Sequence, residues 1–480
     1  MASPITSQEN ATCQWLREFP KKIKKSGQDD PRRITHSLKV GFALTLVSMF
    51  FYVQALYDSF GVNTLWAIMT VVVVMEFSVG ATLGKGLNRM AATLLGGFLG
   101  FGVQQLATLP GKTNQAILLA IFLFIIGAVM TYIRCIPGVK AKYDYGFSIF
   151  ILTFSLVSIS GYRNDESETL ELSCKRLFTI IIGSILSMIV SACIFPVWIG
   201  EDLHHSVAKN IEKIGDFLEG FINDSFNVSE ENKSKNEKSF AEEYESVLNS
   251  KTKEENMANL ASWEPRHGKF QFNHPWKQYL KVGNSTRQCA YKIEALDYHI
   301  KSKIQITHEL RNKIKDTCQH ICLESGKALK ELSLSIKSMK CLSKTNYKTY
   351  IANAKEAIES LSTMLKSNLS GGGVEVNLLE VVAIAAMASL LMDVVISIER
   401  ISEQVDELAS LAHFKSHNNN VHQDETKATR TRPLPLLREG IMKRFFPRDK
   451  MPHHHNNRIH ESSIGSPKQN RSSTIEVIVQ

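Results

Sequence analysis

Residues 114–133 read NQAILLAIFLFIIGAVMTYI, a run of apolar and small side chains that holds no charge. A helix needs about 20 such residues to cross the hydrocarbon core of a bilayer, so this run predicts a membrane-spanning helix. Five further stretches of this kind fall within the first 200 residues, and Glu76 is the only charged side chain in any of them. The six predicted spans are Val40–Tyr57, Gly61–Gly84, Met90–Leu109, Asn114–Ile133, Tyr145–Tyr162 and Leu177–Gly200.

The rest of the chain has a different pattern and predicts soluble helices. Apolar side chains recur at intervals of three and four residues between Ile351 and Leu365, as in an amphipathic helix. We therefore predict an all-α membrane protein with six transmembrane helices, followed by a cytosolic helical bundle and a disordered C-terminal tail. The expected divisions are a basic cytosolic N-terminus (1–37), a transmembrane domain (38–200), a cytosolic helical domain (201–414, with a mobile polar segment at about 227–259) and a disordered basic tail (415–480).

One later stretch, Leu378–Ile398, is apolar enough to be considered as a seventh span. Glu380 and Asp393 lie within it, and carboxylates at membrane depth are costly. We therefore expect a soluble helix there instead.

Lysine and arginine favour the cytosolic side of a membrane. Eight of them precede the first predicted span, and the second and fourth connections between spans are richer in them than the alternate connections, once Lys175 and Arg176 are counted with the start of the sixth span. Both termini are therefore predicted to be cytosolic, and the N-terminal segment lacks the short apolar core of a cleavable signal peptide. Four sequons after the last span should then stay unglycosylated; they begin at Asn223, Asn227, Asn232 and Asn284.

The sequence gives no support to an enzyme. It lacks H-E-x-x-H, G-x-S-x-G and the phosphate-binding G-x-x-x-x-G-K-S/T. Its eight cysteines have no zinc or disulfide spacing, so we expect no cofactor and assign no metal site. The net charge of +9 is compatible with nucleic acid, anionic lipid or small anions. Because positive charge lies at the ends of predicted spans, we expect small anions and the lipid bilayer as partners, and no nucleic acid.

Several motifs resemble the plant aluminium-activated malate transporter family. The longest is WAIMTVVVVMEFSVGATLGKGLNR (66–89), through the second predicted span. The others are Asp30-Pro-Arg-Arg, Tyr143-Asp-Tyr-Gly, Pro196-Val-Trp198, and Trp263-Glu-Pro265 with Gly268, Phe270, Pro275-Trp276 and Tyr279. The resemblance covers about Asp30 to Phe414 and implies a homodimeric anion channel of six-span subunits, each with a helical cytosolic domain. It also implies passage of malate and, depending on the member, chloride, nitrate or sulfate, without aluminium activation in every member.

An anion that crosses hydrocarbon needs positive charge along its path. The candidates are Lys85, Arg89, Arg134, Lys140, Lys142 and Arg176. The alternative is that these residues only set the topology and anchor lipid headgroups. Arg89 and Arg176 rank first, because we expect them at helix ends beside apolar faces, where two subunits would double each into a ring. The planar fork of arginine also suits the two carboxylates of malate.

Glu76 is a functional candidate, since a carboxylate within a span requires a partner. We expect Lys39 or an arginine of the pore to hold it, in a structural or a gating role. On the outer side, an acidic rim either senses hard cations such as aluminium or is only a solvated loop. The rim consists of Asp58, Asp165, Glu166 and Glu168.

The motif Trp263-Glu264-Pro265 is expected to join the cytosolic helices to the membrane domain or to the partner subunit, and to hold the channel in a state that can be gated. The residue before a proline is pushed out of helical geometry, so regular helix should end there. We expect Glu264 to pair with Arg266 or Arg287. The aromatic residues expected to pack as a rigid plug are Trp263, Phe270, Trp276 and Tyr279.

The resulting prediction is an anion channel for malate efflux from the cytosol, gated by voltage or ligands. We expect it in the plasma membrane, with the vacuole membrane as the alternative. A different class is a proton-coupled exporter of organic or aromatic acids, because the layout also resembles fusaric-acid-resistance proteins. Such a carrier needs a buried carboxylate that titrates, and Glu76 would be the candidate.

Overall fold

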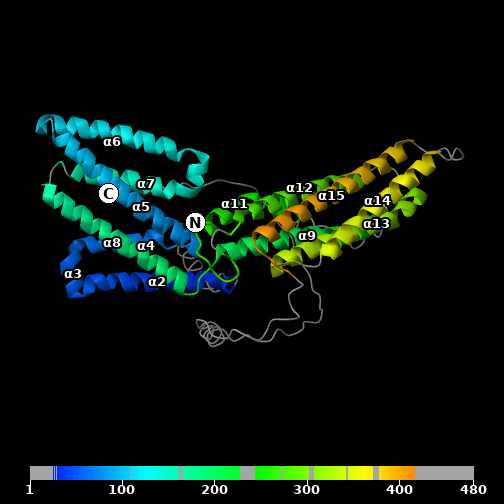
Figure 1. Ribbon diagram of the computed structural model, residues 1–480, viewed down its shortest axis with the longest axis horizontal. Coiled ribbons are helices and arrows are strands. Elements are labelled where there is room, and N and C mark those ends of the chain that lie inside the picture. The colour runs from blue at the N-terminus through cyan, green and yellow to red at the C-terminus, as the bar shows by residue number, and fades with distance from the viewer. Residues whose placement is uncertain are drawn as a thin grey trace, which may run out of the picture. The chain divides into compact units, whose positions relative to one another are not determined.

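Nearly every described residue lies in a helix. The computed structural model describes residues 25, 27–28, 30–109, 111–160, 162, 166–226, 244–271, 274–301, 308–341, 344–370 and 378–416, all within one unit, Met1–Asp424. The predicted all-α membrane class is confirmed: a group of long apolar helices comes first and a second group of helices follows (Figure 1). The predicted tail lies outside the described residues from position 417 onward.

The first group contains the predicted spans. Its elements are α2 (Pro31–Tyr52), α3 (Gln54–Phe60), the 3-10 turn η1 (Gly61–Asn63), α4 (Thr64–Val74), α5 (Val79–Thr108), α6 (Lys112–Arg134), α7 (Pro137–Ser160) and α8 (Glu166–Cys193). They provide six helical stretches long and apolar enough to cross a membrane, with α3 to α4 counted as one. Pro31 starts α2 in a position that suits proline, and the Asp30 carboxylate accepts the Arg32 backbone N–H at 3.1 Å.

The second and third spans divide at a different place from the one predicted. Helix α4 ends and α5 begins inside the predicted span Gly61–Gly84, with residues 75–78 between them, so the predicted start of the third span at Met90 was wrong. The Ser78 side chain caps α5 by accepting a backbone N–H of its first turn at 3.3 Å. A serine cap inside an apolar run is a weak sequence signal, which explains the error. Glu76 therefore lies in the turn between two helices and not inside a span.

Glycines let α5 approach α7 closely. A Cβ atom at Gly96 would lie 2.8 Å from the Phe150 carbonyl oxygen, and one at Gly100 would lie 3.0 Å from the Phe154 carbonyl oxygen. Larger side chains would not fit there, so the two helices pack backbone against backbone, as small residues allow in membrane helices. This pair forms one wall of the cavity described below.

The second group consists of α9 (Ile199–Phe226), α11 (Lys251–Ala261), α12 (Trp276–Lys301), α13 (His308–Ser338), α14 (Lys344–Ser370) and α15 (Leu378–Leu411). Figure 1 shows α12 beside α15 and α13 beside α14. Two short parallel strands, β1 (Lys340–Cys341) and β2 (Lys415–Ser416), pair in the same group. The helices enclose one core, in which Tyr279, Leu296 and Leu329 are fully buried.

Helix α15 holds a seventh stretch that is long and apolar enough to span a membrane, Glu380–Leu411. Its apolar side chains Ile384, Leu391 and Ile398 are buried in the bundle core, and α15 packs against α12, α13 and α14. This packing accounts for its composition, in keeping with the prediction of a bundle helix. The segment predicted to be mobile, at about 227–259, is described from residue 244, and its last part belongs to α11, where Glu254 is buried.

Candidate anion-binding site

Two arginines predicted for the anion path line one cavity between α4, α5, α7 and α8. The cavity has a volume of about 260 Å3, and its wall includes Arg89 of α5 and Arg176 of α8. The remaining wall is mostly apolar, with Trp66 of α4 and Thr93 of α5 among the exceptions that carry a polar group. Such a cavity concentrates positive charge inside an apolar helical group.

Arg89 is buried, with 6% of its surface exposed. Its Nε donates a hydrogen bond to the Thr70 hydroxyl at 3.1 Å, and its Nη1 donates one to the Tyr145 hydroxyl at 2.9 Å. Both acceptors are neutral, and no described acidic side chain lies within 4 Å of the guanidinium. The two bonds therefore fix the side chain and leave its charge uncompensated.

Arg176 lies against an aromatic face. Its guanidinium carbon is 5.3 Å from the centre of the Trp66 ring, a distance typical of cation–π contact. Its Nε is buried and has no hydrogen-bond partner among the described residues, and the same holds for the Thr93 hydroxyl. Buried polar groups in native proteins are nearly always paired, so these two atoms indicate a site that takes a ligand or water.

Both arginines lie further from the ends of their helices than predicted. Arg89 follows the start of α5 by ten residues, and Arg176 follows the start of α8 by ten residues. At a rise of 1.5 Å per residue, each is about 15 Å along its helix, well beyond the first turn. The expectation that they lie at helix ends was wrong, because α5 and α8 each begin eleven residues before the predicted spans Met90–Leu109 and Leu177–Gly200.

Two of the other predicted cations are paired with carboxylates. Lys85 forms an ion pair with Glu76, at the turn that precedes α5. The expected partners of Glu76, Lys39 or an arginine of the pore, are therefore incorrect. Arg134 binds Asp144 with both of its arms, at 2.6 Å and 3.1 Å.

The remaining two predicted cations lie in the first turns of α7. Lys140 is exposed to solvent. The Lys142 Nζ lies 5.0 Å from the centre of the Trp263 ring and 5.7 Å from that of Tyr143. Neither lysine is among the residues that line the cavity.

Of the predicted acidic rim, the structure describes one side chain in full. Asp58 is exposed and accepts a hydrogen bond from the Gln54 amide at 2.8 Å. Asp165 and the side chains of Glu166 and Glu168 lie outside the described residues. Cation sensing by this rim stays a prediction.

Trp263 contacts the first group of helices and does not join the predicted plug. Its ring meets Tyr143 of α7 edge to face, with centroids 6.0 Å apart. A Cβ atom at Gly84 would lie 3.0 Å from the Trp263 ring, so the indole sits in a notch that only glycine leaves open. The plug itself forms without it: the centroids of Phe270 and Trp276 are 5.4 Å apart, and those of Trp276 and Tyr279 are 5.6 Å apart.

Glu264 caps the start of α9 and does not pair with an arginine. Its carboxylate accepts the backbone N–H of Ile199 at 2.7 Å and that of Gly200 at 3.1 Å, as an N-terminal cap of a helix does. Burial raises the pKa of Glu264 from its usual 4.5 to about 7. The predicted partner Arg287 pairs with the buried Glu254 instead.

The prediction missed the polar side chains around the two arginines, although their spacing in the sequence is regular. Trp66 and Thr70 are four residues apart on α4, and Arg89 and Thr93 are four apart on α5. Residues at this spacing share one helix face. The sequence therefore places a polar pair on one face of α4 and another on one face of α5, and these two faces could have been predicted to contact each other.

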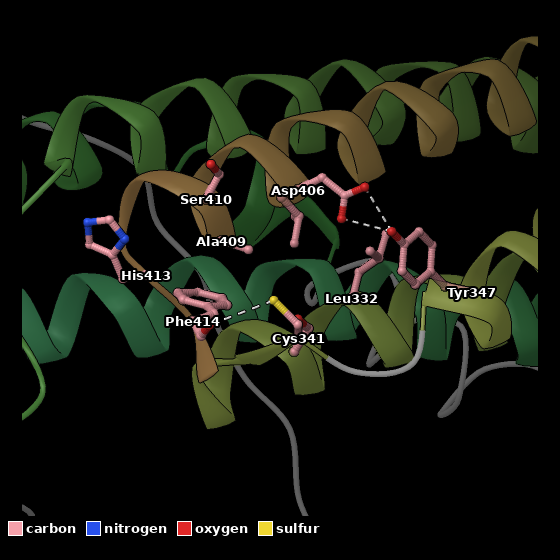
Figure 2. Close-up of a pocket in the computed structure, with 10 residues that line it drawn as sticks. Leu332, Cys341, Tyr347, Asp406, Ala409, Ser410, His413 and Phe414 are labelled. Carbon is pink, nitrogen blue, oxygen red and sulfur yellow. Dashed lines mark hydrogen bonds between the residues drawn. The ribbon is translucent and has the colours of Figure 1, made fainter. Parts of the chain in front are cut away.

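A second cavity, in the other group of helices, has the wrong sign for an anion. It measures about 310 Å3 and is shown in Figure 2. Asp406 points into it and accepts the Tyr347 hydroxyl at 2.8 Å and 2.9 Å. No lysine or arginine is among the described residues that line it, whereas His413 is.

Comparison with known proteins finds relatives across most of the chain. The family described as "Aluminium activated malate transporter" matches residues 24–371. Aluminum-activated malate transporter 2 of Arabidopsis thaliana is 48% identical over 84% of this chain and 79% of the relative. Aluminum-activated malate transporter 7 of the same plant is 45% identical over 84% of each chain. Aluminum-activated malate transporter 1 of Triticum aestivum is 42% identical over 83% of this chain and 86% of the relative.

Proposed function

Because this chain belongs to the aluminium-activated malate transporter family, we propose that it is an anion channel that passes malate and inorganic anions down their electrochemical gradient. The observation that carries this proposal is the cavity of about 260 Å3 with Arg89 and Arg176 in its wall. Both guanidinium groups lack an acidic partner among the described residues. An anion in transit is the group that such a cavity would stabilise.

The energetics favour an anion over water alone. An uncompensated charge in a low-dielectric region is costly, and the cost falls when an opposite charge comes within contact distance. Two unit charges 4 Å apart attract each other by about 4 kcal/mol at an effective dielectric constant of 20. Malate carries two carboxylates, and each can take the parallel N–H groups of one guanidinium. We therefore assign Arg89 and Arg176 as the principal residues of the anion path.

The other predicted cations take supporting positions in this proposal. Lys85 and Arg134 are neutralised by Glu76 and Asp144, so they stabilise the helix ends and supply less field to the path. Lys140 and Lys142 lie at the start of α7, where they attract anions toward the entrance. A homodimer would present each of these residues twice.

Membrane voltage sets the direction of flow. Moving one elementary charge across 100 mV is worth about 2.3 kcal/mol, so anions leave a cytosol that is negative inside. With both termini in the cytosol, as the lysine and arginine distribution predicts, the channel would release malate across the plasma membrane. The same channel in a vacuole membrane would fill the vacuole.

The position of Glu76 disfavours the exporter. A proton-coupled carrier needs a buried carboxylate that titrates, whereas the Glu76 side chain is 37% exposed and paired with Lys85 in a turn. Glu76 therefore holds a lysine at the start of α5, the structural role among those predicted for it.

Electrical recording tests the proposal. Full-length protein in planar bilayers with a tenfold malate gradient should give currents that reverse about 30 mV from zero, the equilibrium potential of a divalent anion. A pH gradient of one unit should leave this reversal potential unchanged. The control is the double variant Arg89→Gln, Arg176→Gln, which should reach the membrane and pass little malate. A reversal potential that follows the pH gradient would establish the exporter instead.

A further inference from the structure

His267 faces Glu264 at the point where α9 begins. The His267 Nε2 lies 3.7 Å from the Glu264 Oε2, and the two side chains are 8% and 1% exposed. The other ring nitrogen, Nδ1, lies 2.8 Å from the Pro265 carbonyl oxygen. A carbonyl oxygen only accepts hydrogen bonds, so Nδ1 carries a proton.

The proton on Nδ1 determines what Nε2 can be. If the ring is neutral, Nε2 presents a lone pair, and it is buried with no hydrogen-bond partner among the described residues. A lone pair opposite an ionised carboxylate oxygen is unfavourable where both atoms are buried. One proton between the two groups removes this conflict, either as imidazolium with carboxylate or as imidazole with carboxylic acid.

We propose that Glu264 and His267 form a proton-binding site that holds one proton between them and fastens the start of α9 to the start of α5. The ring of Trp198 holds the imidazole of His267 in place, since the two rings are stacked with centroids 4.0 Å apart and an interplanar angle of 6°. Neither residue is among the described residues that line the cavity with Arg89 and Arg176, and the ligand of the proposed site is the proton itself.

Glu264 contacts both α9 and α5 closely. Glu264 accepts the first two backbone N–H groups of α9, from Ile199 and Gly200. On α5, a Cβ atom at Gly80 would lie 2.3 Å from the Leu260 carbonyl oxygen and 3.0 Å from the Glu264 Cγ. The carboxylate therefore lies between two helices with no room to turn away when its charge changes.

Several other titratable groups lie near Glu264 and His267. Asp202 in the first turn of α9 raises the pKa of Glu264, and its carboxylate is held by Arg32 of α2 at 3.0 Å. Burial lowers the pKa of His274 to about 4, so this residue stays neutral near pH 7. The first two turns of α5 contribute one charged group, Lys85, which is paired with Glu76, and the last turn of α11 contributes no titratable side chain. Arg266 and Lys269 flank His267 in the connecting loop.

The sign of the pH dependence follows from Glu264. Burial raises its pKa from 4.5 to about 7, so the folded protein binds this proton more tightly than the unfolded chain does. Its contribution to stability is complete below pH 4.5 and is lost as the pH rises through about 7. A site that titrates at pH 7 changes its protonated fraction about tenfold between pH 6 and pH 8.

The consequence for transport rests on the proposed function. If the fastened state conducts, the anion current at fixed voltage should fall up to about tenfold when the pH on the α9 side rises from 6 to 8. Two variants should remove this dependence. Glu264→Gln carries an amide that can donate to His267 at any pH, and His267→Gln carries one that can donate to Glu264 at any pH. The matched control is His205→Gln, which changes an exposed histidine of α9.

The experiment combines excised-patch currents with thermal unfolding of the detergent-purified full chain at pH 6 and pH 8. We expect the wild type and His205→Gln to unfold at a higher temperature at pH 6, and the difference to shrink in both test variants. Currents and melting temperatures that do not depend on pH in the wild type would overturn the site, as would a dependence retained by both variants. If Glu264→Gln does not accumulate, His267→Gln decides alone, because it leaves the carboxylate and its two N–H donors in place. Absence of anion current from every protein would refute the channel, and the melting data would still judge the proton site.

Discussion

Replacing Arg176 with glutamine tests the anion path at its least constrained residue. The guanidinium lies against Trp66 and its Nε has no partner among the described residues, so the change breaks no described hydrogen bond of that atom. It removes one positive charge and keeps most of the side-chain volume. A hydrogen bond to a charged group is worth about 1.5–3 kcal/mol, which corresponds to roughly 10- to 150-fold weaker binding of malate.

The comparison between anions sharpens this prediction. In Arg176→Gln, chloride loses the attraction of one cation. It loses no bidentate hydrogen bonds, because a spherical ion makes none with a guanidinium. We therefore expect the malate-to-chloride permeability ratio to fall in Arg176→Gln. Arg176→Lys keeps the charge and loses the fork, so its permeability ratio should lie between those of the wild type and the glutamine variant.

Arg134→Gln serves as the matched control. Arg134 is also a basic residue of an apolar helix, but it is bound to Asp144 and does not line the cavity. Its pair is about 40% exposed, so its loss should cost at most about 1 kcal/mol and change the half-saturating malate concentration less than twofold. The assay is the half-saturating malate concentration and the bi-ionic reversal potential in patches with equal protein at the membrane. Equal effects of the two variants would refute the reasoning, because charge at a distance would then explain both.

Three further results are expected. Gly80→Leu should reduce the patch current and lower the melting temperature, because even a Cβ atom at this position would lie 2.3 Å from a carbonyl oxygen of α11. Gly102→Leu, also on α5 but with nothing within 4 Å of such a Cβ atom and outside the lining of the cavity, should change neither. Arg287→Ala should lower the free energy of unfolding, measured by chemical denaturation, by about 3–5 kcal/mol, because it removes the ion-pair partner of the buried Glu254. Lys281→Ala, which removes an exposed ion pair with Glu407, should lower it by at most about 1 kcal/mol. Asn284 should carry no glycan in a eukaryotic host, and a glycosidase-sensitive shift that disappears in Asn284→Gln would overturn the predicted topology.

The sequence predicts well what depends on local composition. Uncharged runs of about 20 residues identify spans because the bilayer imposes that length on any helix, and each run is read by itself. Arg89 and Arg176 could also be proposed from local sequence, because each directly precedes an uncharged run. Their meeting at one cavity could not, because it depends on how α4, α5, α7 and α8 pack.

The partner of Glu264 was unpredictable for a different reason. The sequence offers arginines as visible candidates for a carboxylate, and Arg266 and Arg287 were chosen on that basis. The observed donors are backbone N–H groups of Ile199 and Gly200, more than sixty positions away in the chain. Every residue except proline carries such a donor, so nothing in the side-chain pattern distinguishes these two.

The position of α5 explains how the second group of helices could act on the anion path. Gly80, which receives the end of α11, and Arg89 in the cavity lie nine residues apart on this one helix, about 14 Å at 1.5 Å per residue. A continuous helix transmits a displacement of its first turn along its length, and close packing at Gly96 and Gly100 makes α7 follow. Arg176 is on α8, which packs against α4 as extensively as against α5, whereas α11 packs against α5 and α7. Movement at the Glu264 junction would therefore change the separation of the two arginines, and that separation determines whether one dicarboxylate can engage both.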